Sequence, residues 1–156
     1  MNQKRERLTK PSTKPTLIIG WRETIALPQL GISKIKAKID TGARTSVLHA
    51  FHIQTSDRNG KKIIRFQVHP FQRDSKTTVT AEAELLEYRE VRNSGGIAQL
   101  RPVILTEVEL GGEKWSLELT LTNRDVMGFR MLLGRQAIRR KFLVDPGKSF
   151  IQSRRP

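Results

Sequence analysis

The most constraining feature of the sequence is a strict alternation of lysine and apolar residues between Lys34 and Ile39. The six residues read Lys-Ile-Lys-Ala-Lys-Ile, and successive side chains of an extended chain point to opposite faces. One face of this segment is therefore apolar, and the other is charged. The pattern predicts a β-strand with one face in a core and the other in water.

The same period of two recurs through the rest of the chain. Alternating apolar residues occupy three further segments, 64–68, 79–85 and 115–121. The pair Gly111-Gly112 separates the apolar-rich run Val103–Leu110 from the run that begins at Trp115, which predicts a hairpin. Asn59-Gly60 and Pro146-Gly147 predict further turns.

One helix is predicted, from near Gly134 through Arg140, with Ile138 and Phe142 four residues apart on one face. The fold class is therefore all-β, a small closed or partly open barrel with one short C-terminal helix. A chain of 156 residues is long enough for one domain. Residues 1–15 are basic, rich in proline and almost without apolar side chains, so we expect a disordered basic tail followed by a single domain over residues 16–156.

Composition excludes several classes of site and of protein. The chain has no cysteine, which removes disulfides, thiolate zinc sites and cysteine nucleophiles. No apolar run approaches the roughly 20 residues of a membrane helix, and the N-terminus lacks the apolar centre of a signal peptide. We therefore expect a cytoplasmic protein without membrane contact.

The charge balance predicts anionic partners without choosing among them. Lys and Arg total 29 against 15 Asp and Glu, a formal net charge of +14, which attracts nucleic acid, ribosome surfaces and acidic peptides alike. One functional hypothesis is therefore a non-catalytic basic β-barrel module that binds RNA or the ribosome. The Lys34, Lys36 and Lys38 stripe and a basic cluster between Arg135 and Lys141 would carry it.

A second hypothesis starts from Asp40-Thr41-Gly42, which directly follows the alternating strand. A carboxylate at the end of a buried strand is partly desolvated, which disfavours its charged form. Gly42 permits a tight turn close to the carboxyl group, and the Thr41 hydroxyl can fix the geometry. All three residue types are also typical of an ordinary strand-ending turn.

Further motifs downstream make the pattern more specific. Met131–Arg135 is a short apolar strand closed by glycine that leads into a helix. With it, the sequence resembles the retropepsin-type aspartic proteases, and more narrowly a small bacterial family labelled ATP-dependent zinc protease and associated with ribosomal modification. The matching text is I-D-T-G-A-R-T-S-V-L-H-A at 39–50, R-P-V-I at 101–104, L-T-N-R-D at 121–125 and M-G-F-R-M-L-L-G-R at 127–135.

The resemblance implies an aspartic-type endopeptidase with a retropepsin-like acid protease fold. Because the chain has one Asp-Thr-Gly, a homodimer would place two Asp40 carboxylates around one water. Thr41 would brace the paired loops, and Gly42 would present backbone to the substrate. The implied substrate is a peptide or protein, and the positive net charge of the chain favours one that is acidic or glutamate-rich. The implied partners are the ribosome or an ATP-grasp ligase.

Other residues would support this site. Ala43 would contact the substrate, and Gly95, Gly96 and Ile97 would form the tip of a flap over the cleft, although a plain surface hairpin loop has the same composition. Gly134 and Arg135 would support the catalytic loop. The C-terminal apolar runs 142–144 and 150–151 would supply strands of the dimer interface.

The sequence departs from the retroviral pattern in two places. Arg44 stands where those enzymes commonly carry an acidic residue, so an ion pair with Arg135 cannot form and we expect different support for the dimer. The extra stretch His52–Arg89 is expected to add a hairpin.

The histidines are the residues of this sequence that could form a zinc site. His49 and His52 are three apart and would share a face on a helix, where Asp57 could join them. The sequence contains neither H-E-x-x-H nor the phosphate loop G-x-x-x-x-G-K-[ST]. We therefore expect no metal and no cofactor.

Overall fold

The structure is a computed structural model that describes residues 16–93 and 95–156. The predicted basic tail, residues 1–15, lies outside the described residues. The elements in chain order are β1 (Leu17–Gly20), β2 (Arg22–Leu27), the 3-10 turn η1 (Pro28–Leu30), β3 (Ile32–Asp40), β4 (Ser46–His49), β5 (Phe51–Arg58), β6 (Lys61–Val68), β7 (Val79–Arg92), β8 (Ala98–Leu110), β9 (Glu113–Thr122), β10 (Met131–Gly134), α2 (Arg135–Ile138) and β11 (Phe142–Asp145).

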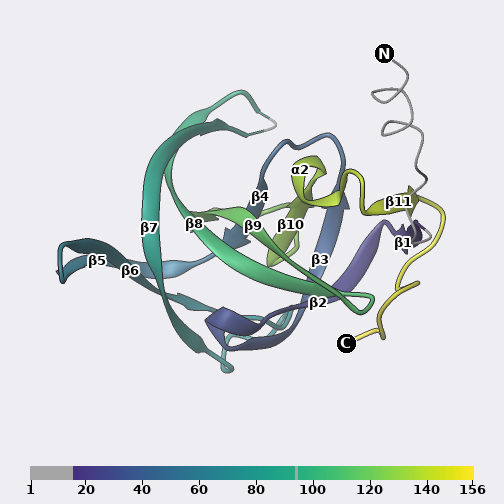
Figure 1. Ribbon diagram of the computed structural model, residues 1–156, viewed down its shortest axis with the longest axis horizontal. Helices are drawn as coiled ribbons and strands as arrows, with labels where there is room; N and C mark the ends of the chain where they lie inside the picture. The colour runs from purple at the N-terminus through teal and green to yellow at the C-terminus, as the bar shows by residue number, and fades with distance from the viewer. Residues whose placement is uncertain (1–15, 94) are drawn as a thin grey trace, which may run out of the picture.

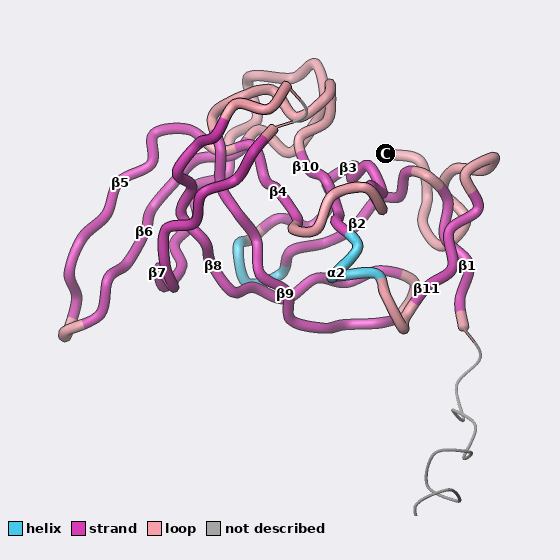
Figure 2. Tube along the Cα trace, turned by 90° about the horizontal axis from the view of Figure 1, so that it is seen from above, coloured by secondary structure: helices cyan, strands magenta, loops and turns pink. Residues whose placement is uncertain are grey.

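Most strands form one curved sheet in the order β2-β3-β10-β4-β9-β8-β7-β6-β5, while β1 and β11 pair in parallel beside it. A further pairing of Ala26 with Glu109 joins β2 to β8. This contact bends six of the strands into a partly open barrel. The β5–β6 hairpin projects at one side and the β1–β11 pair lies at the other (Figure 1, Figure 2). The all-β prediction is confirmed.

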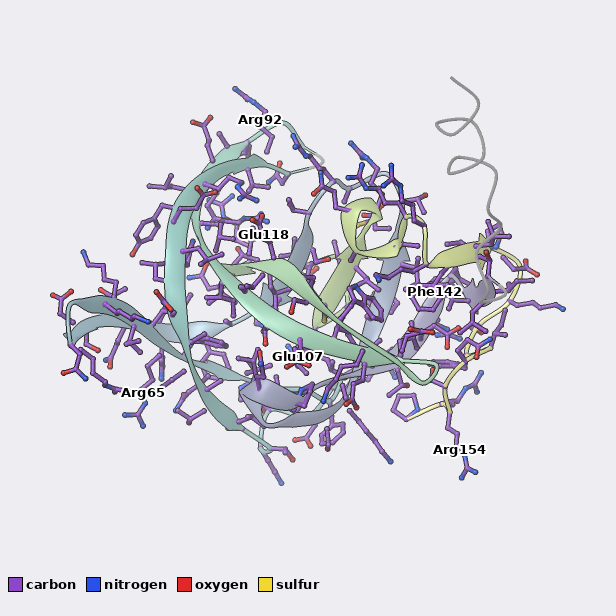
Figure 3. The ribbon with its side chains drawn as sticks, in the orientation of Figure 1. Arg65, Arg92, Glu107, Glu118, Phe142 and Arg154 are labelled. Atoms are coloured by element: carbon purple, nitrogen blue, oxygen red, sulfur yellow. The ribbon has the colours of Figure 1, made fainter. Side chains whose placement is uncertain are left out.

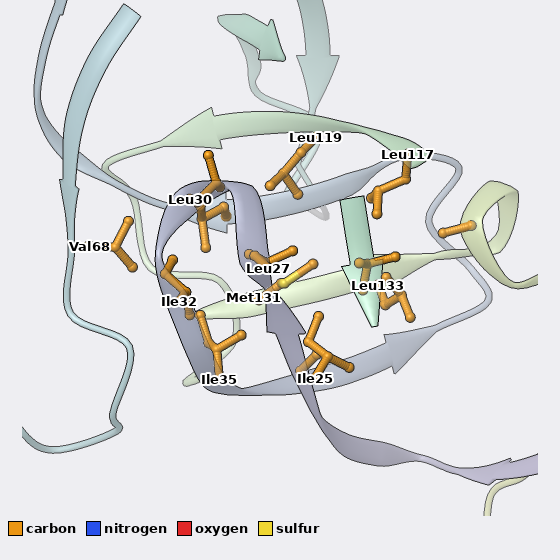
Figure 4. Packing of buried hydrophobic residues seen from close by; sticks show 14 of the residues in the cluster. Ile25, Leu27, Leu30, Ile32, Ile35, Val68, Leu117, Leu119, Met131 and Leu133 are labelled. Carbon is orange, nitrogen blue, oxygen red and sulfur yellow. The ribbon is translucent and has the colours of Figure 1, made fainter. Parts of the chain in front are cut away.

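The core lies inside this curved sheet. In β3 the side chains of Ile35, Ala37 and Ile39 are buried, whereas the lysines between them are exposed or half-buried, as the alternation predicts. Leucine, isoleucine and methionine side chains of β2, β9 and β10 pack against them (Figure 4). Within the described residues, no helix is long and apolar enough to cross a membrane.

The hairpin of β7 and β8 is longer than the sequence pattern predicts. The alternation that starts at Val79 is interrupted after Leu85, where a register shift lies between Leu85 and Glu87. Such a bulge adds one residue to one strand and displaces the period of two. Both strands nevertheless continue to Arg92 and from Ala98, so the hairpin extends well beyond the barrel.

The predicted helix is shorter than expected. It ends at Ile138, because Arg139 has extended dihedral angles and Arg140 has a positive φ of 68°. Phe142 therefore does not share a helix face with Ile138; it lies in β11, opposite Leu17. Its buried ring packs at 5.4 Å from the ring of Trp115. The spacing of four between Ile138 and Phe142 therefore does not indicate a helix here, because Phe142 pairs with β1 as part of a strand.

A buried carboxylate fastens the C-terminal segment to β1 and β2. Glu23 is fully buried, and its oxygens accept hydrogen bonds from donors at both ends of the chain. These donors are Gly20 N at 2.7 Å, Ile151 N at 2.9 Å, Gln152 N at 3.1 Å and Ser153 Oγ at 2.7 Å. The segment therefore packs on the body of the domain.

Candidate active site

Asp40 is the last residue of β3 and pairs in parallel register with Gly134 of β10. Its carboxylate is held from its own loop, because Gly42 N donates to Asp40 Oδ1 at 3.1 Å. A Cβ on Gly42 would lie 3.3 Å from that oxygen, so a glycine gives the closest approach of backbone to the carboxylate. Oδ2 has no hydrogen-bond partner among the described residues. Oδ1 is thus held by the loop, and Oδ2 is available to bind a water molecule or a substrate.

The loop after Asp40 is held by the start of α2. Arg135 N donates to Ala43 O at 2.8 Å, and Gln136 N donates to Arg44 O at 3.2 Å. Arg135 Nη1 donates to Gly42 O at 3.1 Å. The Arg135 guanidinium thus contacts a backbone carbonyl of the loop, where the retroviral pattern would have a carboxylate.

Gly134 is required by packing rather than by dihedral angle. A Cβ there would lie 2.7 Å from both the carbonyl carbon and the oxygen of Thr45, which is shorter than any normal contact. Gly134 N also donates to Ser46 Oγ at 3.0 Å in a buried hydrogen bond. The two segments, 41–46 and 134–136, therefore form one closely packed unit around Asp40.

A cavity of about 1040 Å³ opens beside Asp40. It lies between this unit and the part of the β7–β8 hairpin close to its tip, at residues 89–93 and 101. Of the residues predicted for the site, Asp40, Gly42, Ala43 and Arg135 line it, whereas the other predicted residues do not. The remaining wall is formed by Arg44, Thr45, Val47, Arg89, Glu90, Val91, Arg92, Asn93, Arg101, Glu118, Asp125, Val126, Met127, Leu132 and Gln136.

Thr41 and the hairpin tip stand at the margins of the cavity. Thr41 is exposed, and its hydroxyl has no hydrogen-bond partner among the described residues. At the tip, Asn93 Oδ1 accepts from Gly95 N at 2.9 Å and from Ile97 N at 3.0 Å, and Gly96 has a φ of +80°. Ile97 is 57% exposed. The tip is a turn organised by one asparagine.

The hairpin brings to the cavity two arginines that the sequence motifs do not assign to the site. Arg89 and Arg101 are direct partners across β7 and β8. Arg89 forms ion pairs with Glu87 and with Glu118, the latter at 2.9 Å, and hydrogen bonds to these carboxylates raise its pKa. Arg92 lies near the hairpin end and Glu118 within the arch below it (Figure 3).

Arg101 is in the opposite situation. Its side chain is buried, with 6% exposed, and it pairs with no carboxylate among the described residues. Its Nε donates to Gln99 Oε1 at 2.9 Å, while burial and then the nearby Arg124 lower its pKa. The Nη atoms make no hydrogen bond in the described part of the chain. The sequence signal for it is one arginine opening the apolar text R-P-V-I.

The histidines do not share a helix face. His49 lies in β4, and His52 lies in β5 with a positive φ of 51° at a register shift between Phe51 and Gln54. His49 Nε2 lies 3.2 Å from Asn123 O, and burial, with the charge of Arg130, lowers the pKa of His49. Among the described residues, no three His, Asp or Glu side chains are grouped so that they could hold a metal ion.

Comparison with known proteins gives a consistent picture. Residues 18–155 match the family described as "Retropepsin-like aspartic endopeptidase RimB". A crystal structure of a Legionella pneumophila protein of unknown function superposes with a TM-score of 0.71 and 30% sequence identity, covering 88% of this chain and 98% of that one.

Curated relatives are much longer proteins. A "Probable alpha-L-glutamate ligase" of Shewanella pealeana is 47% identical over 133 residues, which is 85% of this chain and 29% of the relative. One of the same name from Parasynechococcus marenigrum is 50% identical over 130 residues, 83% of this chain and 28% of the relative. The chain thus spans less than a third of the length of these relatives.

Proposed function

Because the chain belongs to the family of RimB-like, retropepsin-like aspartic endopeptidases, we propose that it hydrolyses peptide bonds with a water held between two Asp40 carboxylates. The observation that carries this proposal is Asp40 itself. Its carboxylate lines the cavity of about 1040 Å³ with one oxygen held by Gly42 N. The loop around it is packed against residues 134–136, so its position is fixed in advance of substrate.

The chemistry requires a pair of carboxylates that share one proton, because two like charges at contact distance do not both ionise. The ionised Asp40 takes a proton from water as the oxygen attacks the carbonyl carbon of the peptide. The protonated Asp40 gives its proton to the carbonyl oxygen. As the tetrahedral intermediate collapses, one of its hydroxyl groups returns a proton to the second carboxylate and the carbonyl forms again. The carbon–nitrogen bond breaks, and the amine leaves with the proton held by the first carboxylate, so the pair again shares one proton.

A second copy of the chain supplies the second Asp40 in this proposal. The exposed and unpartnered hydroxyl of Thr41 supports it, since such a group next to a twofold axis can bond to its own copy. Ile18 and Leu143, which are 47% and 61% exposed, face each other across β1 and β11. These two apolar side chains form a strip that a partner strand would cover.

Acidic peptides are the substrates that the cavity favours. Four of its arginines, Arg44, Arg92, Arg101 and Arg135, form no ion pair among the described residues. A buried guanidinium without a carboxylate is costly unless a ligand provides one. We therefore assign Arg101 to the binding of a substrate carboxylate.

The proposal includes association with a glutamate ligase. The relatives that contain a segment like this chain carry the name of a probable alpha-L-glutamate ligase. In the proposal, the chain cleaves glutamate-rich extensions of the kind that such ligases build, and it acts beside the ligase or on the ribosome.

The test compares the full chain with Asp40→Asn on peptides that end in glutamates and on the same peptides with glutamine. Asp57→Asn, an exposed carboxylate of the β5–β6 hairpin, is the matched control. We expect cleavage of the glutamate peptides by the wild type and the control and none by Asp40→Asn, with the dimer retained in sedimentation. Cleavage that survives in Asp40→Asn would overturn the proposal.

A further inference from the structure

A second concentration of charge lies outside the cavity, on the outer face of β2 and β3. Its centre is Lys36, whose pKa is lowered by burial and by the positive charges of Arg22, Arg73 and Arg155. We call these four residues the Lys36 cluster. None of them forms an ion pair within the described part of the chain. Three cations therefore act on Lys36 without a side-chain carboxylate paired to any of the four, which favours the binding of an anion at this surface.

The cluster borders a cavity of its own. This cavity measures about 450 Å³ and is separate from the Asp40 cavity, with which it shares no residue. Lys36 and Arg73 form part of its wall, and Phe71 stands beside them with 38% of its surface exposed. Lys34 also lines it, although Lys34 faces a second cavity that contains Glu109 and Glu113. The unopposed cations are therefore Lys36 and Arg73.

Aromatic rings are interleaved with the cations. The Arg22 guanidinium carbon lies 4.7 Å from the centre of the Trp21 ring and 5.1 Å from that of Phe150. Arg155 contacts the same Phe150 ring at 5.7 Å. Rings and positive charges therefore lie side by side on this face. Aromatic rings and cations together are what bases and phosphates of an unpaired strand require.

The backbone holds two of these residues in an uncommon conformation. Arg73 and Phe150 have φ angles of 59° and 54°, in the left-handed region that side chains other than glycine rarely adopt. Arg22 Nε is buried without a hydrogen-bond partner among the described residues. Two residues with an uncommon backbone conformation and one unpaired buried donor therefore lie at this face.

From these observations we propose that the Lys36 cluster binds single-stranded nucleic acid, with phosphates on Lys36 and Arg73 and a base stacked on Phe71. An acidic peptide would use the cations and leave the exposed ring unused, which is why a nucleic acid strand is the better occupant. The proposal does not depend on the peptidase activity. It also differs from a non-catalytic basic module, since the two cavities occur on one domain.

The position of the cluster gives the binding a consequence for the Asp40 site. Lys36 and Asp40 are on the same strand and the same face, four residues apart, or about 13 Å at the rise of an extended chain. Lys38 lies between them, and its Nζ is 3.7 Å from Sδ of Met127, which lines the Asp40 cavity. A bound strand would therefore lie beside the mouth of that cavity and anchor the domain on a nucleoprotein substrate.

The test measures binding of the full chain to labelled oligomers by fluorescence anisotropy at several salt concentrations. The probes are a ten-nucleotide oligouridylate, its deoxy counterpart and a ten-residue polyglutamate. The double variant Lys36→Gln with Arg73→Gln removes two cations of the cluster. The matched control, Lys61→Gln with Lys62→Gln, removes two exposed lysines of the β5–β6 hairpin. Circular dichroism checks that each variant is folded.

We expect the wild type to bind the uridylate with a steep salt dependence. The cluster variant should bind at least tenfold more weakly at low salt, with the slope of log K against log salt reduced by about 1.4, since each phosphate contact to a single strand contributes about 0.7. The control pair should bind within about twofold of the wild type. Phe71→Ala should lose about fivefold or more through the lost stacking and leave the salt slope unchanged.

Three outcomes would overturn the proposal. Equal losses in the cluster and control variants would show a diffuse field instead of a site. Unchanged binding by Phe71→Ala together with equal affinity for polyglutamate would assign the face to acidic peptides. Failure of the wild type to bind either oligonucleotide would end the proposal outright. A preference for ribose over deoxyribose identifies RNA as the source of the strand, and Asp40→Asn should bind as the wild type does, whatever becomes of the peptidase proposal.

Discussion

Replacing Arg101 by methionine should raise the free energy of unfolding and, at the same time, lower the preference of the protein for acidic peptides. Methionine has a similar length and no charge, so the change keeps the packing and removes only the guanidinium. The buried side chain has no carboxylate partner among the described residues, and burial holds its pKa below the usual value. A base whose pKa is lowered by folding destabilises the folded state at every pH below that pKa. Its removal therefore adds stability throughout the physiological range.

The structure also limits what is lost. Gln99 Oε1 accepts from Thr122 Oγ1 at 2.9 Å as well as from Arg101, so the change leaves no buried acceptor without a donor. Replacing buried charge with apolar side chains ranges from neutral to a gain of a few kcal/mol, and we expect about 1 kcal/mol here. In a domain of this size that raises the melting temperature by about 2–4 °C.

The effect on substrates has the opposite sign. A hydrogen bond to a charged group contributes about 1.5–3 kcal/mol, or roughly 10- to 150-fold. We expect kcat/KM for a glutamate peptide to fall by that factor, with kcat/KM for the matched glutamine peptide within about threefold of wild type. Urea unfolding at neutral pH gives the stability, and binding of the same peptides to the Asp40→Asn background gives a second readout.

The refuting result is specific. A methionine variant that unfolds more easily by about 1 kcal/mol or more, with equal losses on both peptides, would show that Arg101 supports the hairpin and does not read a carboxylate. Arg89→Met is the matched control. Because Arg89 already pairs with Glu118, it should lose stability and show no preference between the two peptides.

Three further predictions concern the frame of the site. Gly134→Ala places a methyl group 2.7 Å from Thr45 backbone atoms, so we expect a loss of about 2 kcal/mol or more in urea unfolding; an unchanged midpoint would contradict the packing described. Truncation after Arg140 removes β11 and the donors to Glu23, and should abolish the dimer, whereas a dimer that persists in sedimentation would refute the interface. The pKa of His49 is lowered in the folded protein, so its protonation opposes folding, and stability should fall as the pH drops below the unfolded pKa of about 6.5. The variant His49→Gln should make stability less dependent on pH in this range, and an unchanged pH profile would show that His49 is not the cause.

The local pattern predicted most of the strands because it depends on burial of one face. The alternation at 34–39 became β3, and Gly111-Gly112 became the β8–β9 turn. The sequence could not show that β7 and β8 continue past Leu85, since a bulge displaces the period there. It also placed Phe142 on a helix, because the spacing of four does not reveal a parallel partner more than a hundred residues away at Leu17.

Only part of the candidate site could be predicted from the sequence. Asp40, Thr41 and Gly42 are adjacent in the sequence, so one motif contains all three. Arg101 and Gln136 come to the cavity from β8 and α2, and only the register of long hairpins and parallel pairs brings them there. A sequence does not show which arginines have a carboxylate partner in the fold, so it does not distinguish Arg101 from the other arginines.

The Glu23 carboxylate makes the integrity of one end of the chain depend on the other. Its donors at Ile151, Gln152 and Ser153 are separated from it by 128 to 130 positions, so the contact closes one of the longest loops in the domain. Each hydrogen bond to a charged group contributes about 1.5–3 kcal/mol, and a carboxylate that stays buried without its donors is strongly unfavourable. The strands β1 and β2 and residues 151–153 are therefore expected to open and close as one cooperative unit.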